Sequence, residues 1–224
     1  MQTGLEESKN GFEKMAAYFG ERAKGEVGLI VTGGIAPNRA GWVGPFSSKL
    51  STKSEARHHQ KITKAVHAEN GKICLQILHS GRYGYHPLAV APSAIKSPIS
   101  PFKPWKLNKR GIERTINAFV RCAALAQEAG YDGVEVMGSE GYLINQFIVS
   151  KTNKRKDQWG GSYENRIRFP IEIVRRIREK VGPNFIVIYR LSMLDLVEDG
   201  RSCEEVEQRA LEIGAAGAAV ISTG

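Results

Sequence analysis

The stretch GVEVMGSEGYLINQFIVSKTNKRKDQWGGSYENRIRF, Gly133 to Phe169, decides the fold because a short apolar strand runs directly into a polar, glycine-rich loop. Val134 and Val136 have the composition of a buried strand. The loop that follows brings Tyr142 together with amide and basic side chains that no core-packing requirement explains. Polar chemistry placed directly after a buried strand predicts that this strand delivers a functional loop to a site.

Helical and strand patterns alternate on both sides of this stretch. The predicted helices cover residues 12–24, 53–70, 112–130 and 162–181, and a fifth begins at Ser202, with Glu205 completing a capping box. The predicted strands cover residues 27–32, 72–78, 133–137, 185–191 and 218–222. Apolar strands in alternation with helices are typical of a parallel sheet that is buried on both faces. Pro170 lies inside the fourth helix and predicts a kink or a break there.

Two observations favour a barrel over a doubly wound sheet. No Gly-x-Gly-x-x-Gly turn follows the early strands, and polar residues collect after several different strands. A closed TIM (β/α)8 barrel needs eight strands, whereas the sequence contains about five βα units. The predicted fold class is therefore α/β, a TIM barrel truncated at both ends, with residues 1–224 forming one partial domain.

Composition indicates a soluble, folded, cytoplasmic protein. The chain has 224 residues, of which 42% are hydrophobic and 25% charged, as in globular domains. No leader pattern and no membrane-length apolar run is present in the sequence. Cys74, Cys122 and Cys203 lack metal-site spacing and are expected to be buried thiols. The pair His58 and His59 is expected to form an exposed helix face or a cap rather than a metal pair, so no metal site is predicted.

The net charge of +9 is compatible with a nucleic acid, an anionic membrane or an anionic ligand. Basic residues cluster in KTNKRK (residues 151–156) and RRIREK (residues 175–180). The simplest interpretation is solvated helix faces. No recognised nucleic-acid motif accompanies these runs, so neither a nucleic-acid partner nor a membrane partner is predicted.

Candidate site residues lie at or just beyond the carboxyl ends of several predicted strands, and those ends share one face of a barrel. They are Thr32, Gly33, Gly34, Gln76, His79, Arg82, Glu140, Tyr142 and Arg190. The two glycines would let the backbone approach a flat ligand, Gln76 offers a donor and an acceptor, and Arg190 can neutralise negative charge. The set suits a planar heterocycle with imide-like edges. Tyr142 is either a general acid or an aromatic anchor that packs the loop.

Four motifs resemble the Old Yellow Enzyme family of NADH:flavin oxidoreductases over essentially the whole chain. They are VTGGIAP (residues 31–37), QILHSGR (76–82), VAPSAI (90–95) and GYDGVEVMGSEGYLINQF (130–147). The sequence is most similar to the FMN barrel domain of bacterial-type 2,4-dienoyl-CoA reductases. The resemblance implies FMN across the carboxyl mouth of a TIM barrel and an ene reductase that transfers hydride to a conjugated acyl chain such as a 2,4-dienoyl-CoA.

The resemblance also assigns roles to single residues. Tyr142 matches the family's proton donor, and Lys151 and Glu140 match positions near the substrate. The positions implied to contact FMN are Met1, Gln2, Gly34, Gln76 and Arg190. Many relatives hold a substrate carbonyl with His and Asn where this chain has Met137 and Glu140, a departure that favours the dienoyl-CoA branch. Lys151 replaces an Arg, so it keeps the charge but loses the planar bidentate fork.

Several family features are expected to lie outside this sequence. They are the first barrel strand, the last two strands, the FMN phosphate site and the sites for FAD, a 4Fe-4S cluster and NADPH. Weak or no retention of FMN is therefore expected, and the oligomeric state is left open. The alternatives are a related flavin barrel with another substrate, such as an enone, an amine or oxygen, or a catalytically silent fragment that acts only as a scaffold.

Overall fold

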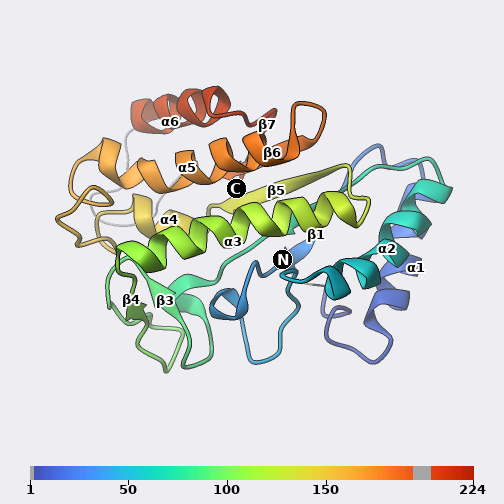
Figure 1. Ribbon diagram of the computed structural model, residues 1–224, viewed down its shortest axis with the longest axis horizontal. Helices are drawn as coiled ribbons and strands as arrows, with labels where there is room; N and C mark the ends of the chain where they lie inside the picture. The colour runs from blue at the N-terminus through green and yellow to red at the C-terminus, as the bar shows by residue number, and fades with distance from the viewer. Residues whose placement is uncertain (1–2, 194–202) are drawn as a thin grey trace.

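A single parallel sheet organises the computed structural model, which describes residues 3–193 and 203–224 (Figure 1). Its strand order is β1-β2-β5-β6-β7. The strands are β1 (Ile30–Ile35), β2 (Ile73–Ile77), β5 (Gly133–Gly138), β6 (Ile186–Leu191) and β7 (Val220–Thr223). Each strand pairs with the next strand of this sheet along the chain, as in a (β/α) barrel, whereas a doubly wound sheet reverses its order at a switch point.

Helices connect consecutive strands and cover one face of the sheet (Figure 1). They are α1 (Gly11–Lys24), α2 (Lys53–Ala68), α3 (Lys109–Glu128), α4 (Leu143–Ile148), α5 (Tyr163–Val181) and α6 (Cys203–Ala215). α1 precedes β1 and packs against α2. Between β2 and α3 the chain forms a flap, defined here as residues 84–107, in which β3 (Val90–Ala91) pairs in parallel with β4 (Trp105–Lys106).

The two faces of the sheet differ in chemistry because side chains alternate along each strand. In β2, Ile73, Leu75 and Ile77 join the hydrophobic core shared with the helices. Gln76, which lies between two of them, points to the opposite face, and Glu135 does the same in β5. The helix-covered face therefore holds the fold together, and the opposite face is free to carry polar groups.

The predicted alternation of five long helices and five strands is confirmed, although some boundaries move. β1 begins and ends three residues later than predicted, so Gly33 and Gly34 belong to the strand. The short helix α4 and the flap strands were not predicted. α5 runs unbroken through Pro170, so a break there is wrong, and a kink stays a prediction. The buried side chains of Phe169, Ile173 and Val174 hold this helix against the core.

The cysteine expectation is confirmed for Cys74 and Cys122, which are buried free thiols. Burial raises the pKa of the Cys74 thiol to about 12, so this side chain is inert at neutral pH. The cap predicted at Ser202 and the side chain of Cys203 lie outside the described residues. Within the described ranges, none of the helices is long and apolar enough to cross a membrane.

Candidate functional site

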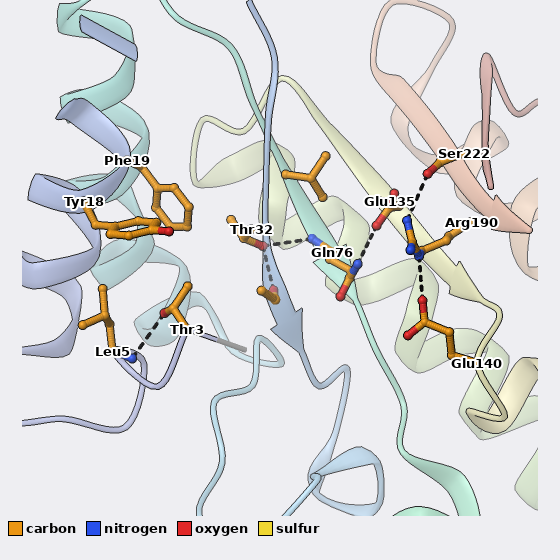
Figure 2. A pocket seen from close by; sticks show the side chains of 12 residues that line it. Thr3, Leu5, Tyr18, Phe19, Thr32, Gln76, Glu135, Glu140, Arg190 and Ser222 are labelled. Carbon is orange, nitrogen blue, oxygen red and sulfur yellow. Dashed lines mark hydrogen bonds and ion pairs between the residues drawn. The ribbon is translucent and has the colours of Figure 1, made fainter. Parts of the chain in front are cut away.

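A cavity of about 670 Å³ opens on the face of the sheet that the helices leave free (Figure 2). All five strands of the sheet or the loops at their carboxyl ends contribute to its wall, and the polar lining comprises Thr32, Gln76, Glu135, Glu140, Arg190 and Ser222. Tyr18 and Phe19 of α1 provide an aromatic wall on one side. The volume lies in the usual range for small-molecule sites, about 300–1,000 Å³.

Strand register aligns these side chains at two levels, because Glu135 lies opposite Ile188 and Arg190 is two residues further along β6. Gln76 in β2 lies between Gly34 of β1 and Glu135 of β5. Arg190 in β6 lies opposite Ser222 of β7. Gln76 and Arg190, predicted from separate strands, therefore line one cavity, as expected for the carboxyl ends of parallel strands.

Gln76 is held firmly yet keeps one polar atom unused. Its Nε2 donates to Oε2 of Glu135 at 2.6 Å, and its backbone N–H donates to Oγ1 of Thr32 at 3.0 Å. Its Oε1 is buried and has no hydrogen-bond partner among the described residues. Because a buried acceptor without a partner costs about 1–3 kcal/mol, this oxygen is suited to an incoming N–H donor.

Arg190 carries the positive charge of the cavity. Its Nε lies 3.0 Å from Oε1 of Glu140, and its Nη1 donates to Oγ of Ser222 at 3.3 Å. Glu140 adopts a left-handed backbone conformation, with φ of 59°, directly after β5. The guanidinium is thereby fixed at the cavity wall, where it can bind or stabilise an anionic group.

Tyr142 is the N-cap residue of α4, and its side chain is half-buried rather than a lining group of the cavity. Its ring packs edge-on against Tyr83, with 5.9 Å between ring centroids. Burial raises the pKa of the Tyr142 phenol, and the neighbouring Glu140 and Tyr83 raise it further. The phenol is therefore neutral near pH 7 and can donate a proton.

Gln146 joins the Tyr142 loop to the loop that follows β2. Its Nε2 donates to the carbonyl of Gly141 at 2.7 Å and to that of Ser80 at 3.3 Å. Its Oε1 accepts from the backbone N–H of Arg82 at 3.0 Å. The buried amide thus connects two strand ends that both border the site.

Gly34 has a packing role in addition to the one expected. A Cβ atom at this position would lie 2.6 Å from Cδ1 and 2.8 Å from Cβ of Leu78. The packing of Leu78 against β1 therefore requires a glycine here, and the expectation that the Gly34 backbone also admits a flat ligand stays a prediction. Gly33, by contrast, lines the cavity.

His79 is wholly buried and stacks on Phe119, away from the cavity, with 6.3 Å between ring centroids. Burial lowers its pKa to about 3, so the imidazole is neutral. The prediction of an exposed His58–His59 face is wrong for His59, which is buried 2.9 Å from the hydroxyl of Tyr131. The described residues contain no group of three His, Cys, Asp or Glu side chains placed to hold a metal ion.

The other predicted residues lie apart from the cavity or cannot be placed. Lys151 is exposed in the loop after α4 and does not line the cavity. Arg82 is also outside it, with Nη1 3.5 Å from the carbonyl of Lys96. Met1 and Gln2 lie outside the described residues.

Among the lining residues that sequence reasoning missed are two polar residues of the sheet. Glu135 is a buried carboxyl bound to Gln76, and Ser222 binds Arg190. A signal was available for Glu135, because it is the only charged residue in the strand GVEVMG. A charge in the middle of a buried strand requires a partner, and it therefore indicates the face that carries polar chemistry.

The amino-acid sequence matches the model of the NADH:flavin oxidoreductase / NADH oxidase family over residues 1–223. It is 35% identical over 215 residues to an N,N-dimethylglycine/sarcosine dehydrogenase of Chromohalobacter salexigens, covering 92% of this chain and 30% of the relative. It is 36% identical over 217 residues to an NADH oxidase of Thermoanaerobacter brockii, covering 93% of this chain and 33% of the relative. The chain spans about a third of the length of these curated relatives.

The structure resembles that of a 2-naphthoyl-CoA reductase solved with 2-naphthoyl-CoA, with a TM-score of 0.87 and 34% sequence identity. The likeness covers 95% of this chain and 35% of the solved one. The described sheet is thus part of a TIM barrel, as predicted. On the family match over nearly its whole length, the chain belongs to the NADH:flavin oxidoreductase / NADH oxidase family, the Old Yellow Enzyme family.

Proposed function

We propose that residues 1–224 form part of the FMN-binding barrel of an oxidoreductase that reduces a C=C bond conjugated to the carbonyl of an acyl-CoA, such as a 2,4-dienoyl-CoA. One observation carries the proposal: the buried, unpartnered Oε1 of Gln76 and the guanidinium of Arg190 line the same cavity. An acceptor for an imide N–H and a cation for an electron-rich edge fit the pyrimidine end of a flavin. Bound FMN would supply the hydride, with a nicotinamide nucleotide as electron source.

The chain's own residues then have distinct tasks. Gln76, held by Glu135 and Thr32, would orient the flavin ring, and Arg190 would stabilise negative charge. Glu140 already pairs with Arg190, so we propose that it positions this guanidinium in addition to any contact with substrate. Gly34 would support the site by allowing Leu78 to pack closely, and the expected flavin contacts of Met1 and Gln2 remain proposals.

Tyr142 is the proposed proton donor to the anion that hydride addition leaves on the substrate. Its raised pKa keeps the phenol protonated, and the hydrogen bonds of Gln146 fix the loop that carries it. Loss of a positioned general acid typically lowers a rate by about 10²–10⁴-fold. We expect a decrease of this size for Tyr142→Phe.

The test has two stages because weak flavin retention is expected. FMN is first titrated into the chain, and quenching of flavin fluorescence reports binding. With flavin in excess and reduced by dithionite without oxygen, a 2,4-dienoyl-CoA is then added and flavin reoxidation is followed at about 450 nm. Tyr142→Phe should slow reoxidation without changing FMN binding, and Tyr85→Phe, which alters an exposed tyrosine, should change neither.

Two outcomes would contradict the proposal. If the chain does not quench flavin fluorescence at any concentration, the chain does not bind FMN, and the catalytically silent scaffold is favoured. Reoxidation by the acyl-CoA at the same rate in Tyr142→Phe would remove Tyr142 from the reaction and leave the aromatic-anchor interpretation.

A second candidate is oxidation of a small amine. Two carboxylates, Glu135 and Glu140, line the cavity and could attract an ammonium group, and one curated relative carries the name of a sarcosine dehydrogenase. Glu135 already accepts a hydrogen bond from Gln76, and Glu140 already accepts one from Arg190, which favours the acyl-CoA proposal over amine oxidation. Anaerobic bleaching of oxidised FMN by sarcosine would identify the amine activity.

A further inference from the structure

Positive charge is concentrated in two segments of the chain. Residues 70–112 and 141–156 contain no Asp or Glu. Their basic residues are Lys72, Arg82, Lys96, Lys103, Lys106, Lys109, Arg110, Lys151, Lys154, Arg155 and Lys156. These eleven positive charges exceed the net charge of +9 for the whole chain. The remainder of the protein is therefore close to neutral, and the excess charge lies in these two segments.

In the other basic run, in α5, two of the four basic residues are neutralised locally. Arg175 pairs with Glu172 and Glu179, and Arg176 pairs with Glu172 and Glu113. By contrast, six exposed lysines form no ion pair with any carboxylate in the part of the chain that the structure describes. We call them the basic rim: Lys96, Lys103, Lys106, Lys151, Lys154 and Lys156. The rim is available to an external anion.

The two halves of the rim are joined at the flap. Nη1 of Arg155 donates to the carbonyls of Pro92 at 3.0 Å and Leu107 at 2.6 Å, and the backbone N–H of Lys154 donates to Oγ of Ser93 at 2.9 Å. The flap follows β2, whose end carries Gln76, and the loop with Lys154 follows α4, which begins after Tyr142. Figure 1 shows β3 and β4 near α4, at the same end of the molecule.

An aromatic platform lies within this basic region. The side chain of Trp105 is 71% exposed, and its Nε1 donates to the carbonyl of Pro87 at 3.2 Å. Its backbone N–H donates to the carbonyl of Ala89 at 2.8 Å. The indole is thus fixed by its polar edge and by the β3–β4 pairing while most of its surface stays in solvent. The exposed face of this fixed indole is available for stacking.

A hollow of about 520 Å³ adjoins the indole and is lined by Ala94, Lys103, Pro104, Trp105 and Lys106. A planar ring can stack on Trp105, and the ammonium groups of Lys103 and Lys106 can meet phosphates beside it. The ligand chemistry that matches is a purine that carries several phosphate groups. In the proposed acyl-CoA substrate, this is the adenosine 3′-phosphate 5′-diphosphate at the end remote from the reacting acyl chain.

We propose that the hollow at Trp105, with Lys103 and Lys106, binds the adenine nucleotide end of the acyl-CoA substrate while the acyl chain lies at the Gln76–Arg190 cavity. The inference rests on the proposed acyl-CoA function and adds the site that binds the nucleotide, which we call the seat. The remaining lysines of the basic rim, including Lys151, attract the anionic substrate to this end of the barrel.

Binding of CoA itself, measured by calorimetry without added flavin, tests the seat separately from catalysis. Trp105→Ala should weaken CoA binding roughly tenfold, because the stacking of the base on the indole is lost. Lys103→Glu with Lys106→Glu should weaken it at least as much and should reduce the preference for CoA over dephospho-CoA. The matched control is Lys64→Glu with Lys180→Glu, which changes the net charge equally on the exposed faces of α2 and α5 and should bind as the unaltered chain does.

The possible results separate the seat from the reaction. CoA binding that is unchanged in both flap variants overturns the proposal, as does tighter binding of a single-stranded oligonucleotide than of CoA at the same salt concentration. Equal use of a dienoyl-pantetheine and a dienoyl-CoA by the reduced flavin form would leave the proposed reaction intact and would also overturn the seat. A third result is also informative. If the flap variants lose CoA binding but the unaltered chain does not reoxidise its flavin with the dienoyl-CoA, the seat is supported and the proposed reaction is contradicted.

Discussion

Individual polar residues in the core of this protein are tolerated because each has a specific partner. Glu135 lies in the middle of a buried strand, where an unpaired carboxylate would be very costly, but it accepts a hydrogen bond from Gln76 at 2.6 Å. The same bond fixes the Gln76 amide so that its oxygen lines the cavity. At the residue scale, one interaction therefore satisfies the core and orients a group of the candidate site.

His59 makes stability depend on pH. Burial lowers its pKa from the ordinary 6.5 to about 4, so the folded protein excludes a proton that the unfolded chain binds below pH 6.5. Its contribution is fully present above pH 6.5 and is lost as the pH falls from 6.5 towards 4. We expect about 3 kcal/mol of unfolding free energy to be lost over this window from His59. His79, with a pKa of about 3, adds a loss of the same sign that continues to lower pH.

Urea unfolding between pH 7 and pH 4.5 checks this prediction. His59→Gln should unfold more easily at pH 7 but should show a smaller change with pH than the unaltered chain. His58→Gln replaces the exposed neighbour and serves as the control. An identical pH dependence for His59→Gln and the unaltered chain would contradict the assignment.

At the scale of elements, Gln146 links the short helix α4 to the loop that follows β2. The helix comprises only Leu143–Ile148, so its own backbone hydrogen bonds cannot stabilise it in isolation. The Gln146 side chain donates to the carbonyls of Gly141 and Ser80 and accepts from the N–H of Arg82. The side-chain amide of Gln146 therefore helps to hold the loop that carries Glu140 and Tyr142.

We expect Gln146→Glu to destabilise the protein by about 1–3 kcal/mol, because a carboxylate cannot donate to two buried carbonyls. The size of the side chain is unchanged, so packing is preserved and the hydrogen-bond donor is what is lost. The urea midpoint measures the effect, and Gln158→Glu at an exposed position is the matched control. Equal midpoints for the two variants would show that the amide does not hold the loop.

The long elements were predictable from the sequence, whereas the site was predictable only in part. Helices such as α3 carry an apolar stripe over several turns, which includes Ile116, Phe119 and Ala123. By contrast, α4 is too short to show a period, and the two-residue strands of the flap depend on long-range contacts such as those of Arg155. Gln76 and Arg190 were found because they follow apolar strand residues, but the actual packing role of Gly34 depends on Leu78 of the neighbouring chain segment.

At the scale of the whole molecule, the sheet has a helix-covered face and a face that carries the cavity, and β1 and β7 are its outermost strands. Near β7 an apolar hollow of about 500 Å³ is lined mainly by Leu191, Met193, Val206, Ala210 and Ile221. Val220 of β7 is 45% exposed. A parallel strand at a sheet edge with apolar neighbours is a template for pairing with another chain.

We therefore expect the 224-residue chain by itself to associate as its concentration rises. Val220→Lys should weaken this association, because a charged side chain on an edge strand opposes strand pairing between molecules. Leu211→Lys is the control, since Leu211 is an equally apolar residue, 69% exposed, on α6 rather than on the sheet edge. Sedimentation velocity over a hundredfold range of concentration, roughly 1–100 μM, covers the range in which exposed sheet edges aggregate. If both variants reduce the molecular mass of the associated species equally, association depends on general hydrophobicity and not on the β7 edge. If the unaltered chain stays monomeric at every concentration, the β7 edge does not pair.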